Sequence, residues 1–172
     1  MRLVERAQLI VKGVQYEVVL HVYGENDLKT SADLGATWSA LVPVDASAGT
    51  HEFDPAITVD SGQNITKIAY YHNTDALHFK NRTQVLVKQI PAGSTTPGTA
   101  IVLTTVPDSP EGDANFGLAG GGLGDHLGIA AHGTGTLGGS TSYVAHTNNA
   151  RLGVYFGLQN AESNNHVSKF TY

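Results

Sequence analysis

The sequence predicts an all-β fold of about twelve strands in three sheets. Apolar and polar residues alternate along several segments, which is the period of a half-buried strand. Glycine is abundant, with 20 residues in 172, while charged residues make up only 15% of the chain, a balance typical of turn-rich β proteins. No window combines apolar spacing of three and four residues with capping residues at both ends, so no helix is expected.

A short unit of strand, polar turn and second strand occurs three times along the chain. The segments richest in β-branched and aromatic residues are 14–23, 65–72 and 141–146, and each is followed by a turn rich in Asn, Asp or Gly. An apolar run near a glycine precedes each of them, at 7–13, 55–62 and 127–133. A further strand is expected after each turn, at 27–30, 76–80 and 151–157.

The spacing of apolar anchor residues sets the expected repeat boundaries. The two anchors of a unit are 18 residues apart in the first (Ile10 to Leu28), 20 in the second (Ile57 to Leu77) and 23 in the third (Ile129 to Leu152). We therefore expect a single domain over residues 1–172, with repeat units at about 6–45, 53–91 and 125–172. The intervening residues, about 92–124, are rich in Pro and Gly and are predicted to be an insertion, in which 100–106 could add a strand.

One motif, at residues 31–38, has the form Ser-x-Asp-x-Gly-x-Thr-Trp. It lies where a tight hairpin is required, between the third and fourth expected strands of the first unit. The Asp33 carboxylate is expected to accept hydrogen bonds from turn N–H groups, and Gly35 to take a positive φ. Trp38 is expected to pack its ring beside the strand, while the Ser31 and Thr37 hydroxyls complete the polar network.

This segment resembles the Asp box, or bacterial neuraminidase repeat, of sialidases and related β-propellers. The resemblance implies blades of four antiparallel strands, with the box in the hairpin between the last two strands of a blade. The expected fold is therefore three antiparallel four-stranded propeller-like blades, with a β-sandwich that carries an Asp-box hairpin as the alternative. The motif is intact only in the first unit, since the matching stretches at 80–83 and 159–163 lack its Asp and Gly.

Catalysis does not follow from this resemblance, because the box is a structural element in the family. Sialidase chemistry as the family performs it requires three arginines around the substrate carboxylate, a Tyr nucleophile with a Glu partner, and an Asp acid/base. This chain has only four arginines, Arg2, Arg6, Arg82 and Arg151, and no Arg-Ile-Pro segment. We therefore expect no enzyme activity and assign no catalytic residue, and the arginines argue against a sialidase or glycosidase fragment.

Residues near the turns offer the stacking faces and amide groups that a sugar requires, although core packing also explains many of them. The candidate glycan contacts are Tyr70, Tyr71, His72, Asn73, Tyr143, His146 and Asn148. Asn64 and Asn81 each begin an Asn-x-Thr tripeptide, the acceptor pattern for N-glycosylation in hosts that glycosylate exported proteins.

Composition argues against several other functions. The chain has no cysteine, and its histidines lack the spacing of a local metal motif, so no metal site and no cofactor are expected. A net charge of −5, with ten scattered basic residues, argues against nucleic-acid binding. No segment approaches the roughly 18 apolar residues of a membrane span, and no signal peptide is visible.

These observations favour a non-catalytic structural or adhesive module that self-assembles, such as a virion, tail or surface-appendage subunit. The alternative is a carbohydrate-binding, lectin-like propeller. Propellers close with about four to eight blades, so three units require another partner to complete their packing. The expected partners are copies of the chain, with surface glycans second, and the expected location is extracellular or virion-associated.

Overall fold

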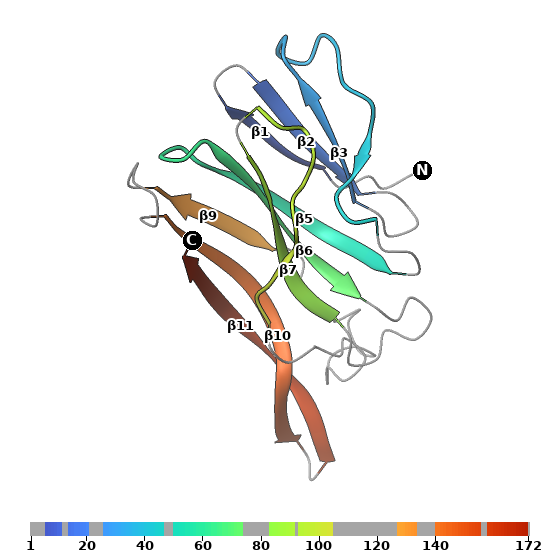
Figure 1. Cartoon of the computed structure of the whole chain (residues 1–172). Helices are drawn as coiled ribbons and strands as arrows, with labels where there is room; N and C mark the ends of the chain where they lie inside the picture. Colours follow the sequence, from blue (N-terminus) through green and yellow to red (C-terminus); the bar gives the residue numbers. More distant parts are fainter. Residues whose placement is uncertain are drawn as a thin grey trace.

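A computed structural model describes residues 6–11, 14–20, 26–46, 50–73, 83–91, 93–104, 127–133, 140–155 and 158–171. They form three antiparallel sheets (Figure 1). The first contains β1 (Arg6–Val11), β2 (Val14–Leu20), β3 (Asn26–Ser31) and β4 (Val42–Pro43). The second contains β5 (His51–Asp60), β6 (Ile65–Asn73), β7 (Thr83–Ile90) and β8 (Ile101–Val102). The third contains β9 (Gly128–His132), β10 (Thr141–Tyr155) and β11 (Leu158–Thr171).

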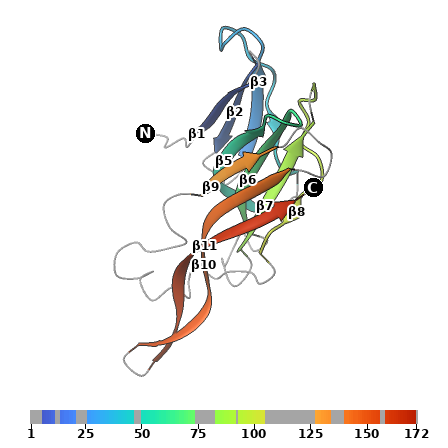
Figure 2. The ribbon, with the colours of Figure 1, turned by 90° about the vertical axis from the view of Figure 1, so that its left-hand side faces the viewer.

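The all-β fold with antiparallel sheets is confirmed, and within these ranges no helix is long and apolar enough to cross a membrane. The third sheet differs from the expected blade, because its described residues form three strands in the order β11-β10-β9. The turn predicted at 147–149 is wrong: β10 continues to Tyr155, with only a register shift between Asn148 and Arg151. Past Ala145, β10 and β11 form a two-stranded ribbon that extends beyond the other sheets (Figures 1 and 2).

The second sheet also differs in the position of its third strand. β7 pairs with β6, so the third strand is Thr83–Ile90 and not the predicted segment 76–80, which lies outside the described residues. The fourth strand, β8, falls inside the segment 92–124 that was predicted as an insertion. It lies within 100–106, where an added strand was expected.

The last hairpins of the first two sheets, β3–β4 and β7–β8, share one backbone geometry. Two equivalent N–H to C=O bonds of 2.8 to 2.9 Å close each hairpin, and every residue of the second set lies 59 positions after its counterpart. The donor and acceptor pairs are Ser39–Thr30 and Val44–Asn26 in the first hairpin, and Gly98–Gln89 and Leu103–Val85 in the second. The first two sheets are therefore structural repeats, and the counterpart of Leu28 is Val87 instead of Leu77.

The second sheet lies between the other two and is covered on both faces (Figure 1). Every residue from 66 to 73 on β6 is buried, and its side chains alternate between two hydrophobic clusters. The cluster toward the first sheet comprises Leu28, Val44, Ile68, Tyr70, Leu86 and Ile90. The cluster toward the third sheet comprises Ala69, Tyr71, Val85, Val87, Leu127 and Val144. The described part of the chain is thus an open stack of sheets and not a closed ring.

A buried lysine links the second and third sheets. Lys67 Nζ donates a hydrogen bond to Ser142 Oγ over 2.5 Å and lies 3.7 Å from Asp60 Oδ2. The side chains of Lys67 and Asp60 have no exposed surface. Burial lowers the pKa of Lys67 from 10.5 to about 8, and the charge of Asp60 acts in the opposite direction. The Asp60 carboxylate therefore offsets part of the cost of burying the ammonium.

Asp60 has further donors besides the lysine. One carboxylate oxygen accepts hydrogen bonds from the N–H groups of Gly62 (3.0 Å) and Gln63 (3.2 Å), and the other accepts the Ser140 hydroxyl. A Cβ at Gly133 would collide with this carboxylate, so the backbone next to β9 can lie this close to Asp60 only because residue 133 is glycine. Asp60 thus shapes the β5–β6 turn and also holds the third sheet.

We expect Asp60→Ala to destabilise the fold more than Lys67→Met. Asp60→Ala leaves a buried ammonium without its carboxylate, at a cost of about 3 to 5 kcal/mol. Lys67→Met leaves the Asp60 carboxylate with the three other donors just described, and methionine fills most of the lysine volume. Urea unfolding of both variants measures the difference, and equal or reversed costs would show that the carboxylate is not the organising group.

Candidate functional site

The loop at residues 31–38 forms the closed hydrogen-bond network that the sequence predicts. Asp33 Oδ1 accepts hydrogen bonds from Thr37 N (2.8 Å) and Ser31 Oγ (2.7 Å), and Asp33 Oδ2 accepts one from Thr37 Oγ1 (2.6 Å). Ser31 Oγ in turn accepts the N–H of Gly35 over 2.7 Å. The Thr37 hydroxyl, followed by the Thr37 N–H and the Ser31 hydroxyl, lowers the pKa of Asp33 from 3.8 to about 2.

The rest of this loop packs against the first sheet. Gly35 has the predicted positive φ, 90°, and a Cβ there would lie 3.0 Å from Gln15 Oε1. The Trp38 ring is partly buried, with the Lys29 ammonium 4.5 Å from its centroid. Lys29 also pairs with the buried Glu17 at 2.8 Å. The polar groups of the loop are thus engaged with one another and with the sheet, which is the arrangement of a structural turn.

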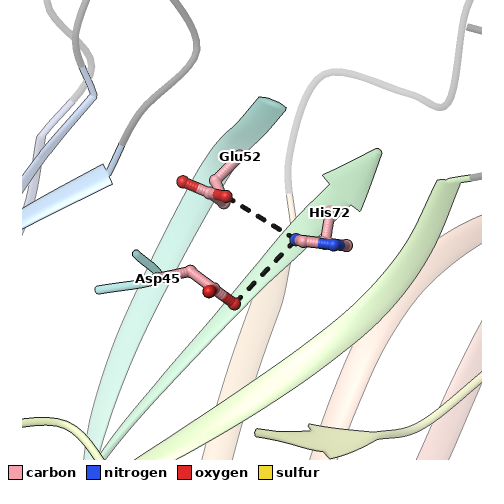
Figure 3. Close-up of side chains that lie close together, drawn as sticks. All are labelled: Asp45, Glu52 and His72. Atoms are coloured by element: carbon pink, nitrogen blue, oxygen red, sulfur yellow. Dashed lines mark ion pairs between the residues drawn. The ribbon is translucent and has the colours of Figure 1, made fainter. Parts of the chain in front are cut away.

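A second polar cluster lies between the first and second sheets and consists of Asp45, Glu52 and His72 (Figure 3). Asp45 follows β4, Glu52 lies on β5 and His72 lies on β6. His72 Nδ1 is 3.6 Å from Glu52 Oε1 and 4.0 Å from Asp45 Oδ2. His72 is only 7% exposed, and its Nδ1 makes no hydrogen bond with any residue that the structure describes. The cluster therefore contains a buried imidazole nitrogen that faces two carboxylate oxygens.

Neighbouring side chains fix the two carboxylates of this cluster. The Tyr70 hydroxyl donates to Asp45 Oδ2 over 2.9 Å, and Lys88 Nζ lies 3.5 Å from the same oxygen. The Thr50 hydroxyl donates to Glu52 Oε1 over 2.9 Å. Burial, reinforced by the negative charge of Asp45, raises the pKa of Tyr70 well above its usual value of 10. Tyr70 is therefore a permanent hydrogen-bond donor to Asp45.

Most of the predicted glycan contacts lie in the interior. Five of them are buried and offer no exposed ring face or amide to a sugar: Tyr70, Tyr71, His72, Asn73 and His146. Tyr143, on the outer face of the third sheet, is 44% exposed. The side chain of Asn148 lies outside the described residues. The structure thus does not bring these residues together on one surface.

The two predicted glycosylation acceptors fall in different parts of the chain. Asn64 ends the turn between β5 and β6, where it is partly buried with a φ of 55°. Asn81 lies outside the described residues. Glycosylation at either position remains a prediction from the tripeptide pattern.

The Lys67–Ser142 pair has the components of a lysine-activated serine nucleophile, because the lysine has a lowered pKa and contacts the hydroxyl. A nucleophile must also reach a substrate. Lys67 and Ser142 are both fully buried between the second and third sheets. The pair is therefore a buried contact that packs the second sheet against the third.

No family model matches the sequence, and the comparison with curated proteins gives no match. Among solved structures, the chain is similar to a Hadza microbial sialidase, with a TM-score of 0.54 and 11% identity over 99% of this chain. It is also similar to an N-acetylgalactosamine deacetylase from F. plautii, solved with blood group B trisaccharide, with a TM-score of 0.54 and 9% identity over 97% of this chain. The matches cover 35% and 49% of those chains, so this chain spans a third to a half of their length. The likeness shows a sialidase-like β fold.

The pKa of Asp33 tests the geometry of the 31–38 loop. We expect the side-chain carboxyl to titrate near 2 by NMR, and Thr37→Val to raise that pKa toward 3.8, because the substitution removes the hydroxyl that lowers it most. The folded-state pKa lies below the unfolded one, so the stabilisation by Asp33 is complete above about pH 4 and is lost as the pH falls through about 2.

Ser39→Ala is the matched control for this titration, since the Ser39 hydroxyl contacts Thr30 N and the Ala40 carbonyl but not Asp33. It should leave the pKa of Asp33 unchanged. An ordinary value near 3.8 in the native chain would contradict the network.

Proposed function

We propose that this chain is a non-catalytic structural or adhesive module of sialidase-like β fold, and that it self-assembles through the outer face of its third sheet. One observation carries the proposal. Side chains along β10 alternate, with Val144 buried against the second sheet and Tyr143 exposed on the opposite face. Tyr143 lies opposite Ala130 of β9, and the next pair on this face is Ala145 with Val167 of β11. We call these four residues the outer apolar face.

Packing within the chain supports this use of the outer apolar face. Sheets in this fold are stabilised by stacking on other sheets, and the second sheet is covered on both sides. On the third sheet, Val167 is 68% exposed and Ala130 and Ala145 are also exposed. The exposed Lys169 of β11 lies opposite Tyr143 and borders these apolar residues on the same face. Covering the apolar residues with another sheet lowers the free energy. A second copy of the chain supplies such a sheet, and identical faces meeting about a twofold axis would close the contact.

The non-catalytic part of the proposal rests on the arginines and on the Asp-box loop. Arg6 lies on β1 in the first sheet and Arg151 on β10 in the third, while Arg2 and Arg82 lie outside the described residues. Two of the four arginines thus belong to sheets separated by the second sheet. Asp33 is engaged within its own loop, which favours a structural role for the box.

Carbohydrate binding is the second candidate function. It draws on the fold likeness to a sialidase and to a deacetylase solved with a trisaccharide. Tyr143 is the predicted contact residue that the described structure leaves on the surface, and an exposed tyrosine ring can stack on a sugar.

Light scattering on the purified chain tests the assembly. We expect a dimer or larger species at micromolar concentration, and a monomer of unchanged melting temperature when Tyr143→Lys and Val167→Lys are combined, because like charges would then face each other across the twofold contact. Leu41→Lys is the matched control: Leu41 is 48% exposed but lies beside β4 in the first sheet, so it should leave the assembly intact.

A native monomer would reject self-assembly. If that monomer bound a glycan array through Tyr143, carbohydrate binding would replace it as the proposed function. Hydrolysis of a fluorogenic sialoside by the purified chain would overturn the non-catalytic assignment.

A further inference from the structure

We propose that Asp45, Glu52 and His72 form a binding site for a first-row divalent cation of the Zn²⁺ type, held between the first and second sheets. The three side chains come from three separate segments and present one nitrogen and two carboxylate oxygens. Their donor atoms all lie within 4.8 Å of one another (Figure 3). One imidazole with two carboxylates is a ligand set that zinc accepts in proteins.

The geometry of His72 favours a cation over a direct ion pair. Nδ1 is 3.6 Å from Glu52 Oε1 and 4.0 Å from Asp45 Oδ2, and both distances are too long for a hydrogen bond. A polar nitrogen in so buried a position normally has a partner. Zinc bonds of about 2.0 to 2.1 Å place tetrahedral ligands roughly 3.3 Å apart, so the donor atoms would have to contract from their present spacing of up to 4.8 Å to hold the ion.

The charge balance of the cluster also favours a cation. Among the residues that the structure describes, the ammonium of Lys88 lies 3.5 Å from Asp45 Oδ2 and so offsets part of the charge of the two carboxylates. With His72 neutral, as metal ligation requires, the Asp45, Glu52 and Lys88 side chains together carry a net negative charge. A bound divalent ion would offset that charge, and Lys88 would weaken its binding by repulsion.

The groups around the cluster act as a supporting shell. The Tyr70 and Thr50 hydroxyls each donate to one of the carboxylates and so fix their orientation, as outer-shell groups do at metal sites. Three protein ligands leave one tetrahedral position for water or a further ligand. Imidazole ligation separates this site from Ca²⁺ and Mg²⁺ sites, which are built from oxygen ligands.

Binding at this site would join the segment after β4 to β5 and β6. The ion would therefore fasten the first sheet to the second, and the folded state would become more stable as metal is added. This role is independent of the outer apolar face on the third sheet.

Isothermal titration of the metal-free chain with Zn²⁺ tests the site. We expect one ion per chain and a higher melting temperature with Zn²⁺ but not with Mg²⁺ or Ca²⁺. His72→Ala should weaken binding at least 100-fold, and Tyr70→Phe, which alters only the supporting shell, by about 10- to 100-fold. Lys88→Met should tighten binding, an effect that a purely structural role for the cluster would not produce.

His132→Ala is the matched control, because His132 is exposed on β9 and should leave the affinity unchanged. If His72→Ala does not fold by circular dichroism, Glu52→Gln replaces it, since the amide keeps the size of the side chain. The proposal is overturned if the native chain takes up no Zn²⁺, or if folded His72→Ala or Glu52→Gln binds it with native affinity.

Discussion

Strand β6 is buried on both faces, and the rest of the described structure is arranged around that constraint. Its apolar side chains alternate between the two hydrophobic clusters, so the first and third sheets each pack on the second. Its polar side chains must find partners in the interior. Lys67 meets Asp60 and Ser142 near one end of the strand, and Asn73 donates to Thr83 at the other. His72 faces Glu52 and Asp45, which makes the candidate cation cluster a consequence of the same burial.

Local patterns predicted the local parts of this fold. The turn at residues 31–38 could be predicted because every hydrogen-bond partner of the Asp33 carboxylate lies within four positions of it in the sequence. The alternation of apolar and polar residues located β2 and β6. The third strand of the second sheet was predicted too early in the sequence, because the connection from β6 to β7 is longer than the one from β2 to β3. The residue equivalent to Leu28 is therefore Val87 and not Leu77. The Asn-rich segment at 147–149 resembled a turn, yet pairing with β11 carries β10 through it.

Properties that depend on distant contacts could not be predicted in this way. Tyr70 and Tyr71 resembled sugar-binding aromatics, but a strand covered on both sides places both rings in the core. Asp45, Glu52 and His72 have no motif spacing, because three separate segments bring them together. The outer apolar face likewise emerges only from the pairing of β9, β10 and β11. A stack of sheets with one covered centre and apolar residues on an outer side is the physical basis for the proposed assembly.

Native-state amide hydrogen exchange tests the central role of β6 most directly. Amides buried between two packed sheets can exchange only when the stack unfolds, whereas strands at the edge of the stack can open locally. The account predicts that amides of residues 66–73 exchange slowest in the chain, ahead of those in β1 and in the ribbon of β10 and β11 beyond Ala145. Exchange in β6 as fast as in β1 would contradict the claim that the double-sided burial of this strand holds the fold together.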